Sequence, residues 1–236
     1  MKYRADKPGP IQRAPCMMIA AALVVACVAC TPAQSLLFSL VPDGTIPVLL
    51  SHFQSVSDVN RRRIAEFEQR RDWDGLAKFA EENLKQDKSN SEWWLIAGYA
   101  YSQADQRKRA IECYAEVVRL APEDMLGWNL LAQSYRLTGQ ADRSLQVLNR
   151  ALAVRRDVPE TWFLLGETYS ELGRLEPAVS AYREALQLDD QFAYAWLGLG
   201  KVYVHLGRDS EVRRVAQVLD KLNPALAKEL AAFKVK

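Results

Sequence analysis

The sequence predicts an all-α solenoid of stacked helix–turn–helix units. The first observation is a set of tryptophans that recur every 34 residues: Trp94, Trp128, Trp162 and Trp196. The second is that other residues keep the same step, with a glycine or alanine four positions after each tryptophan and a tyrosine seven positions after it. A fixed period of this length is typical of repeat architectures, in which each unit buries its apolar face against its neighbours.

Within one unit, the tryptophan, the small residue and the tyrosine lie on one face of a helix. At about 100° per residue, these three offsets fall within roughly 60° of each other. The small residue would let a second helix approach closely. Gly139, Gly173 and Gly207 share a later offset, where glycine can end the first helix in the left-handed conformation. A second apolar run follows, so each unit is a pair of helices.

The repeat frame gives one degenerate and four clear repeats. The clear repeats span residues 91–124, 125–158, 159–192 and 193–226, and the frame extends back over 57–90 without the tryptophan signature. In that first unit, Asp72-Trp73-Asp74-Gly75 is expected to open the second helix and the unit is expected to cap the stack. After the repeat domain (57–222), residues 223–236 predict a capping helix, whose Leu226, Leu230 and Phe233 would cover the last repeat.

The third clear unit carries the pattern W-x2-L-G-x2-Y without a break, from Trp162 to Tyr169. This pattern and the 34-residue period resemble the tetratricopeptide repeat. The resemblance implies a solenoid whose first helices line an inner groove that binds a protein or a peptide. It specifies the fold far better than the partner.

The N-terminus resembles the signal peptide of bacterial lipoproteins. Four basic residues within positions 1–15 precede an uncharged run from Cys16 to Cys30, too short for a comfortable membrane span. Leu23–Cys27 resembles a lipobox, so residues 1–26 would be removed and Cys27 acylated, with Cys30 as the alternative. The resemblance implies an outer-membrane lipoprotein facing the periplasm; an inner-membrane lipoprotein, an uncleaved anchor and an ordinary secretory signal are the alternatives.

Residues 27–56 form a tether with two apolar patches, within 36–41 and 46–50. They show no helical or strand period. The tether could pack on the first helix pair, lie at the membrane surface or bind a partner.

No catalytic constellation is present in the sequence. Gly198-Leu199-Gly200-Lys201 lacks the spacing of a phosphate-binding loop, and His205 has no second histidine at ligand spacing. We expect no enzyme activity, cofactor, metal or small-molecule substrate. The net charge of +2 gives no general attraction to nucleic acid. Cys113, in a second helix, is expected to be a free thiol.

The predicted binding residues lie on the first helices, opposite the tryptophan face. The tetratricopeptide resemblance implies that these positions line the groove, where we expect exposed apolar groups between polar ones. The predicted binding residues are Leu95, Tyr99, Asn129, Gln133, Arg136, Phe163, Glu167, Tyr194, Leu197 and Lys201. Arg136 and the glutamates of the next repeat predict a groove whose charge changes sign along its length. Only Asn129 and Lys201 fit a carboxylate clamp, so capture of a chaperone's C-terminal carboxylate is not expected.

Together these features predict a non-enzymatic scaffold or adaptor, anchored in the bacterial cell envelope, that binds a peptide or protein subunit. It resembles tetratricopeptide lipoproteins that assemble surface machines such as type IV pili. The alternative is an accessory subunit that presents substrates to a membrane-bound enzyme of cytochrome maturation or polysaccharide export. A further alternative places the partner on the tether, at residues 36–50.

Overall fold

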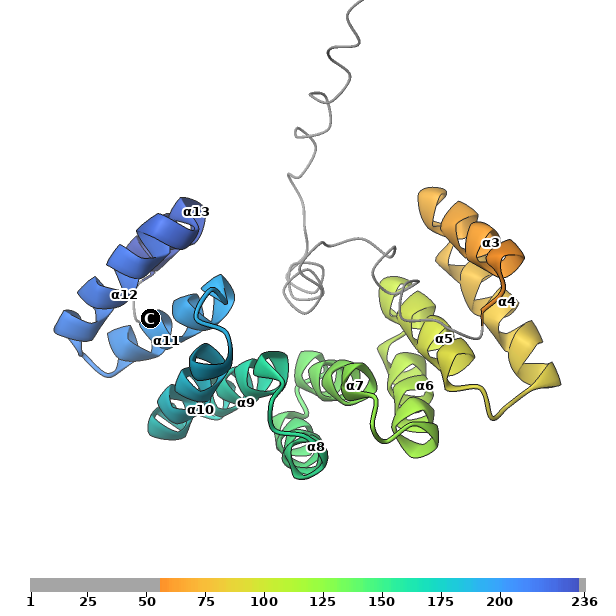
Figure 1. The fold of residues 1–236 in the computed structure, drawn as a ribbon, viewed down its shortest axis with the longest axis horizontal. Helices are drawn as coiled ribbons and strands as arrows, with labels where there is room; N and C mark the ends of the chain where they lie inside the picture. The colour runs from red at the N-terminus through yellow and green to blue at the C-terminus, as the bar shows by residue number, and fades with distance from the viewer. Residues whose placement is uncertain (1–55, 234–236) are drawn as a thin grey trace, which may run out of the picture.

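The computed structural model describes residues 56–233, and this part of the chain is all α-helical (Figure 1). The signal-peptide and acylation predictions and most of the tether lie outside the described residues. The helices, in order, are α3 (Asp58–Gln69), α4 (Trp73–Gln86), α5 (Ser91–Gln103), α6 (Arg107–Leu120), α7 (Met125–Leu137), α8 (Ala141–Val154), α9 (Pro159–Glu171), α10 (Leu175–Leu188), α11 (Ala193–His205), α12 (Asp209–Leu222) and α13 (Pro224–Ala232).

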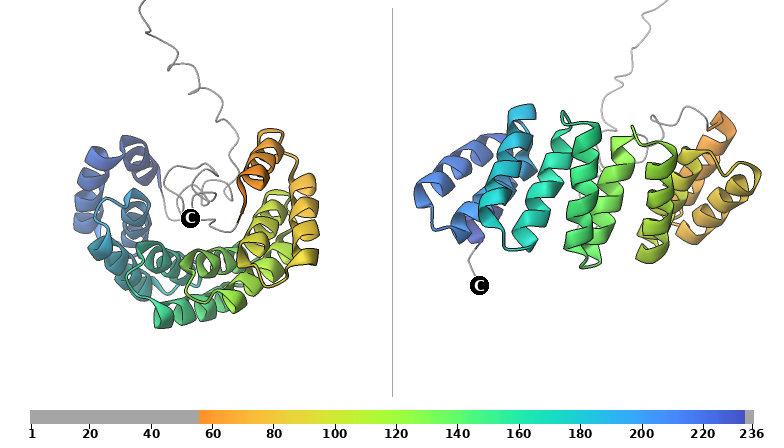
Figure 2. Two further views of the ribbon diagram at one scale, coloured as in Figure 1. Left: turned by 45° about the vertical axis from the view of Figure 1, so that its right-hand side comes forward. Right: turned by 90° about the horizontal axis from the view of Figure 1, so that it is seen from below.

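Consecutive helices pair into five hairpins that stack into an arch (Figure 2). The first helices α7, α9 and α11 contact one another across repeats, whereas the second helices of successive repeats contact one another weakly at most. Helices that approach closely on one side and splay on the other curve the stack. The first helices therefore line the concave side, and the second helices α4, α6, α8, α10 and α12 lie outside. The predicted α-solenoid is confirmed.

The turn inside each hairpin contains one residue in the left-handed region. Gly139, Gly173 and Gly207 have φ of 72°, 69° and 66°, as predicted. The same offset in the two earlier repeats is occupied by Asp105 (φ 58°) and Arg71 (φ 53°). All five positions are 34 residues apart. The first hairpin therefore follows the repeat frame in its backbone, although its sequence lacks the signature.

The four tryptophans fasten the turns between repeats, a role that the sequence did not predict. Each indole N–H donates to the backbone carbonyl six residues earlier. The acceptors are Lys88 (2.9 Å), Pro122 (2.8 Å), Arg156 (2.7 Å) and Asp190 (2.8 Å). Each ring thereby ties the start of its own helix to the turn that enters it.

In two of the four clear repeats, the glycine four positions after the tryptophan makes room for a ring from the second helix. A Cβ placed on Gly166 would lie 2.8 Å from the Tyr182 ring, and one on Gly98 would lie 2.6 Å from the Tyr114 ring. Tyr114 and Tyr182 are both 1% exposed. The close helix approach expected from the sequence is therefore present, and its partner is a buried tyrosine.

Side-chain caps begin a helix in the first hairpin and in the last element of the described solenoid. Asp72 accepts a hydrogen bond from the Gly75 N–H (2.9 Å), which begins α4 where the sequence predicted. Asn223 caps α13 in the same manner. Leu230 of α13 is buried and packs against Gly200 of α11. α13 contacts α11 and α12, so it takes the place of the next first helix.

Cys113 is a buried free thiol in α6, as predicted. Burial raises its pKa to about 12, which keeps the sulfur protonated. Separately, none of the helices between residues 56 and 233 is long and apolar enough to cross a membrane.

The left-handed residue of the first repeat gives a stability prediction. Arg71→Gly should raise the free energy of unfolding by about 0.5–1 kcal/mol, because a Cβ is unfavourable at positive φ and this gain exceeds the entropy cost of glycine. The neighbouring Arg70 has φ of −85°, so Arg70→Gly is the matched control and should destabilise. Urea unfolding followed by circular dichroism measures both changes. A loss of stability in Arg71→Gly would contradict the interpretation.

Candidate protein-binding groove

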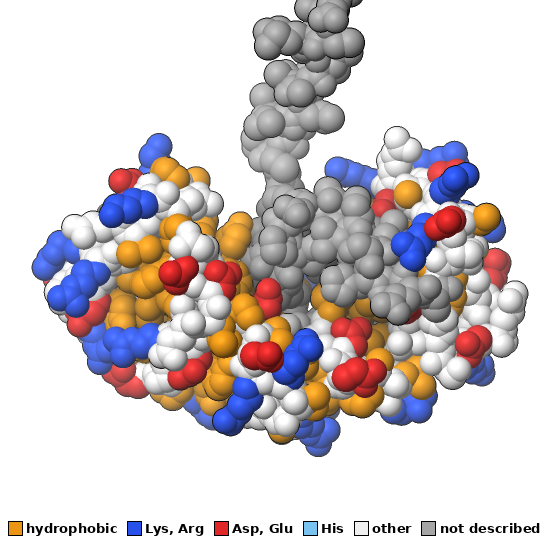
Figure 3. Space-filling view, in the orientation of Figure 1, with side chains coloured by type: hydrophobic (Ala, Val, Ile, Leu, Met, Phe, Trp, Pro, Cys, Tyr) orange, Lys and Arg blue, Asp and Glu red, His pale blue; other side chains and the backbone are white. Residues whose placement is uncertain are grey.

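The concave face is lined by α3, α5, α7, α9 and α11, and the last four of these helices carry the predicted binding residues. Figure 3 shows hydrophobic and acidic side chains interspersed over the arch. Several predicted groove residues are nevertheless buried: Leu95 (3% exposed), Tyr99 (8%), Phe163 (2%) and Leu197 (5%). The expectation that these four side chains are exposed is wrong.

The rings of Phe163 and Tyr99 show the physical reason, because both pack against neighbouring elements of the stack. The Phe163 ring lies 6.1 Å from the Tyr182 ring and 5.0 Å from that of Phe192, which precedes α11. The Tyr99 ring meets the Trp73 ring of the preceding repeat edge-on at 5.8 Å. The tight inner curvature thus turns positions that would be free in a single repeat into core.

Asn129 is also buried, and it forms a bond between repeats. Its Oδ1 accepts from the Thr161 hydroxyl at 2.9 Å, joining α7 to α9. Sequence reasoning missed this role, because no local pattern relates residues 32 positions apart. Tyr194 and Lys201 are half-buried, and Lys201 forms an ion pair with Glu229 of α13 at 2.7 Å.

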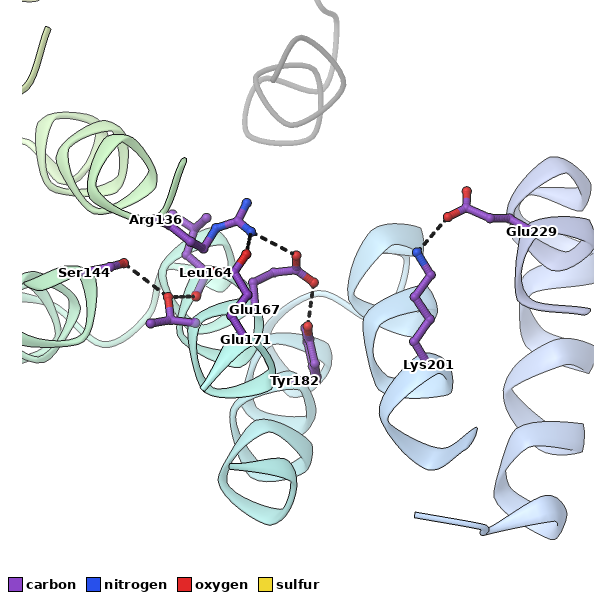
Figure 4. A network of polar contacts seen from close by, with 9 residues as sticks. Arg136, Ser144, Leu164, Glu167, Glu171, Tyr182, Lys201 and Glu229 are labelled. Atoms are coloured by element: carbon purple, nitrogen blue, oxygen red, sulfur yellow. Dashed lines mark hydrogen bonds and ion pairs between the residues drawn. The ribbon is translucent and has the colours of Figure 1, made fainter. Parts of the chain in front are cut away.

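Arg136 is held against two carboxylates of the next repeat (Figure 4). Its Nη1 donates to Glu171 and lies 3.6 Å from a Glu167 oxygen. The other Glu167 oxygen accepts from the Tyr182 hydroxyl at 2.5 Å. Arg136 therefore faces the glutamates of the next repeat, as the sequence placed it, and is paired with two of them. The change of sign along the groove stays a prediction.

One edge of the Arg136 guanidinium has no partner among the described residues. Its side chain is 5% exposed, and Nε and Nη2 are buried without an acceptor. One turn earlier on α7, Nε2 of Gln133 is buried and without an acceptor as well. In Figure 4 the guanidinium extends past its ion pair, with one nitrogen pointing away from both carboxylates. Each unsatisfied buried donor costs about 1–3 kcal/mol, so these three donors indicate a place for acceptors.

Burial raises the pKa of several acidic side chains near the concave face. It raises the pKa of Glu171, against the opposing effect of Arg136, and it raises the pKa of Glu160. The pKa of Glu68, in the last turn of α3, is raised to about 8, because burial disfavours the charged form of this carboxyl group. Its Oε1 has no hydrogen-bond donor among the described residues. The negative charge of Glu68 in turn raises the pKa of Tyr99, after burial.

A separate concavity of about 430 Å³ lies between α8, α9 and α10, on the other side of the solenoid wall. Its lining includes Trp162, Tyr169, Arg156 and Glu184. None of the predicted groove residues lines it. Within residues 56–233 there is no cluster of three or more side chains suited to hold a metal ion.

These features define the class of the protein: an α-solenoid scaffold with a curved face of mixed polarity. Three models of the tetratricopeptide repeat match residues 92–124, 124–191 and 163–227, which together cover more than half of the chain. The chain belongs to the tetratricopeptide repeat family. Members of this family are protein–protein interaction scaffolds, whose repeats bind protein or peptide partners. No curated protein sequence is significantly similar to this chain.

Several solved structures share the fold. A crystal structure of MamA is 21% identical and covers 73% of this chain and 98% of its own, with a TM-score of 0.63. PilW, described as a widely conserved type IV pilus biogenesis factor, is 18% identical and covers 76% and 88%, with a TM-score of 0.61. YrrB, described as having an unusual peptide-binding site, is 19% identical and covers 72% and 89%, with a TM-score of 0.58. At these identities the similarity shows the fold alone.

The raised pKa of Glu68 predicts a pH-dependent stability. The folded state binds this proton more tightly than the unfolded state, so stability should fall as the pH rises from about 4.5 towards 8. Glu68→Gln should make this decline shallower, because the amide does not ionise. Thermal unfolding from pH 5 to 8.5 measures the slope, with Glu66→Gln, an exposed neighbour, as the control. An equal slope in wild type and Glu68→Gln would contradict this prediction.

Proposed function

We propose that this protein is a non-enzymatic adaptor of the bacterial cell envelope, which binds a peptide segment or protein subunit on its concave face. The observation that carries this proposal is the set of buried, unpartnered donors on α7, at the middle of the arch. Donors of this kind favour a ligand that supplies acceptors. Membership of a family of interaction scaffolds supports the same class of function.

We propose further that the adaptor serves the assembly of a surface machine of the type IV pilus kind. The shared fold with PilW supports this proposal. The basic N-terminus, the short apolar run and the lipobox-like Leu23–Cys27 support placement as an outer-membrane lipoprotein facing the periplasm. The lipid chains would hold the solenoid at the membrane surface, since two or more chains bind far more firmly than one.

Site-specific photo-crosslinking tests the concave face. A benzoyl-phenylalanine replaces Tyr194, the half-buried tyrosine of α11, in the full chain expressed in its own envelope. The same probe at Leu188, which is 44% exposed on α10, is the matched control. We expect a defined crosslinked partner from position 194 and none from position 188, because only the former lies on a concave-face helix.

A third probe at Phe38 in the tether distinguishes the alternative site. If crosslinks arise from position 38 alone, the partner docks outside the solenoid and the proposed groove is wrong. Equal crosslinking from 194 and 188 would indicate nonspecific contact and would also count against it.

Acylation is tested with Cys27→Ala and Cys30→Ala, each labelled with an alkyne analogue of palmitate. We expect Cys27→Ala to lose the label and Cys30→Ala to keep it, because the aliphatic lipobox pattern precedes Cys27. The opposite result would move the site to Cys30. Label retained by both variants would remove the lipoprotein proposal altogether.

A further inference from the structure

We propose that Gln133 and Arg136 hold main-chain carbonyl oxygens of an extended peptide segment that carries basic side chains. This inference rests on the proposed function, and it names the chemistry of the partner and the atoms that receive it.

The unpartnered atoms of Arg136 form one geometric unit. Nε–H and one N–H of Nη2 point in parallel from the same edge of the planar guanidinium, and a guanidinium edge of this kind can hold two acceptors, or one oxygen between two donors. The opposite nitrogen, Nη1, is occupied by Glu171 and Glu167. The ion pair therefore fixes the orientation of the guanidinium, while its other, buried edge stays without an acceptor. Arg136 is preorganised rather than free to seek a partner.

Gln133 extends this edge along α7. Residues three apart on a helix are neighbours on its surface, with about 5–6 Å between their Cβ atoms. In an extended peptide, carbonyls two residues apart point to the same side and lie about 6.5–7 Å from each other. The two positions on α7 are thus separated on the scale at which an extended peptide presents successive carbonyls on one side.

The charges around the site favour a neutral acceptor over a carboxylate. Arg136 already faces two carboxylates, so a third would add to an excess of negative charge. The same holds over a wider range. The helices α5, α7, α9 and α11 carry the carboxylates of Glu92, Glu160, Glu167 and Glu171 against Arg136 and Lys201, both of which are in ion pairs. The remaining concave-face helix, α3, carries equal numbers of arginines and carboxylates. A peptide carbonyl brings acceptors without charge. Lysine or arginine side chains on the same peptide would complement the acidic surroundings.

The donor pair belongs to the second clear repeat alone. The equivalent positions hold Tyr99 and Ser102, Glu167 and Ser170, and Lys201 and Val204 in the other three clear repeats. None of these is a pair of nitrogen donors. The main chain of the peptide would therefore be hydrogen-bonded at α7. The side chains of the peptide would contact the acidic helix α9 beside it.

The test uses the full chain and two synthetic peptide libraries of equal length, degenerate in uncharged residues. One library has lysine fixed at alternate positions and the other has glutamate there. We expect the wild type to bind the lysine library at least tenfold more tightly, by fluorescence anisotropy. Gln133→Leu and Arg136→Lys should each weaken that binding at least tenfold. Arg136→Lys keeps the positive charge beside Glu167 and Glu171 but removes the guanidinium edge.

The control is Gln146→Leu, the same substitution at an exposed position of α8, which should bind as the wild type does. Circular dichroism establishes that each variant is folded. Gln133→Leu is expected to keep full stability, because it replaces an unsatisfied buried donor with an apolar group.

Three outcomes would overturn the inference. Unchanged binding in folded Gln133→Leu and Arg136→Lys would place the peptide elsewhere, and preference for the glutamate library would make the ligand a carboxylate. Failure of the wild type to bind either library would exclude an extended peptide backbone as the ligand. If the crosslink from position 194 persists in any of these cases, the proposed adaptor function stands and only the proposed peptide chemistry is wrong. If that crosslink is lost too, both the adaptor function and the peptide chemistry are wrong.

Discussion

The arch depends on one backbone constraint, a left-handed residue in the turn of every hairpin. This residue reverses the chain within a few positions, which places the second helix antiparallel to the first and close against it. Glycine meets the constraint without strain in three repeats, and Arg71 and Asp105 meet it in the first two. The constraint is thus imposed by the packing of the whole repeat, because residues with a Cβ adopt this conformation only when their surroundings require it.

Close packing between the first helices of successive repeats explains where polar groups become buried. Once the first helices pack side by side, any polar side chain on their facing surfaces loses water and needs a partner. Asn129 finds one in Thr161, and one nitrogen of Arg136 finds two in Glu167 and Glu171. The remaining donors of Arg136 and Gln133 do not. A solenoid that buries unsatisfied donors on its concave side gives up stability there, and such local losses are characteristic of functional surfaces.

The repeat frame made most of the fold predictable from the sequence. Tryptophan and glycine positions identify the helix pairs, because 34 residues is a period that chance does not sustain over four units. The groove was less predictable. Position within a repeat identified Gln133, Arg136 and Glu167 as inward-facing, but it could not show that Phe163 and Leu197 would be buried by the neighbouring repeat. It placed Arg136 across from the glutamates of the next repeat, but it could not show which of them would bind it, since contacts between repeats depend on the curvature of the stack, which no single repeat encodes.

The uneven contacts between repeats make the arch mechanically one-sided. The first helices α7, α9 and α11 already touch along the inner surface, whereas the second helices beside them barely do so along the outer one. Tighter bending would compress packed side chains, which proteins resist. Straightening would close only the outer gaps and relieve the inner contacts. The arch therefore resists closing more than it resists opening. Widening it around a bulky partner costs less free energy than drawing it inward around a slender one.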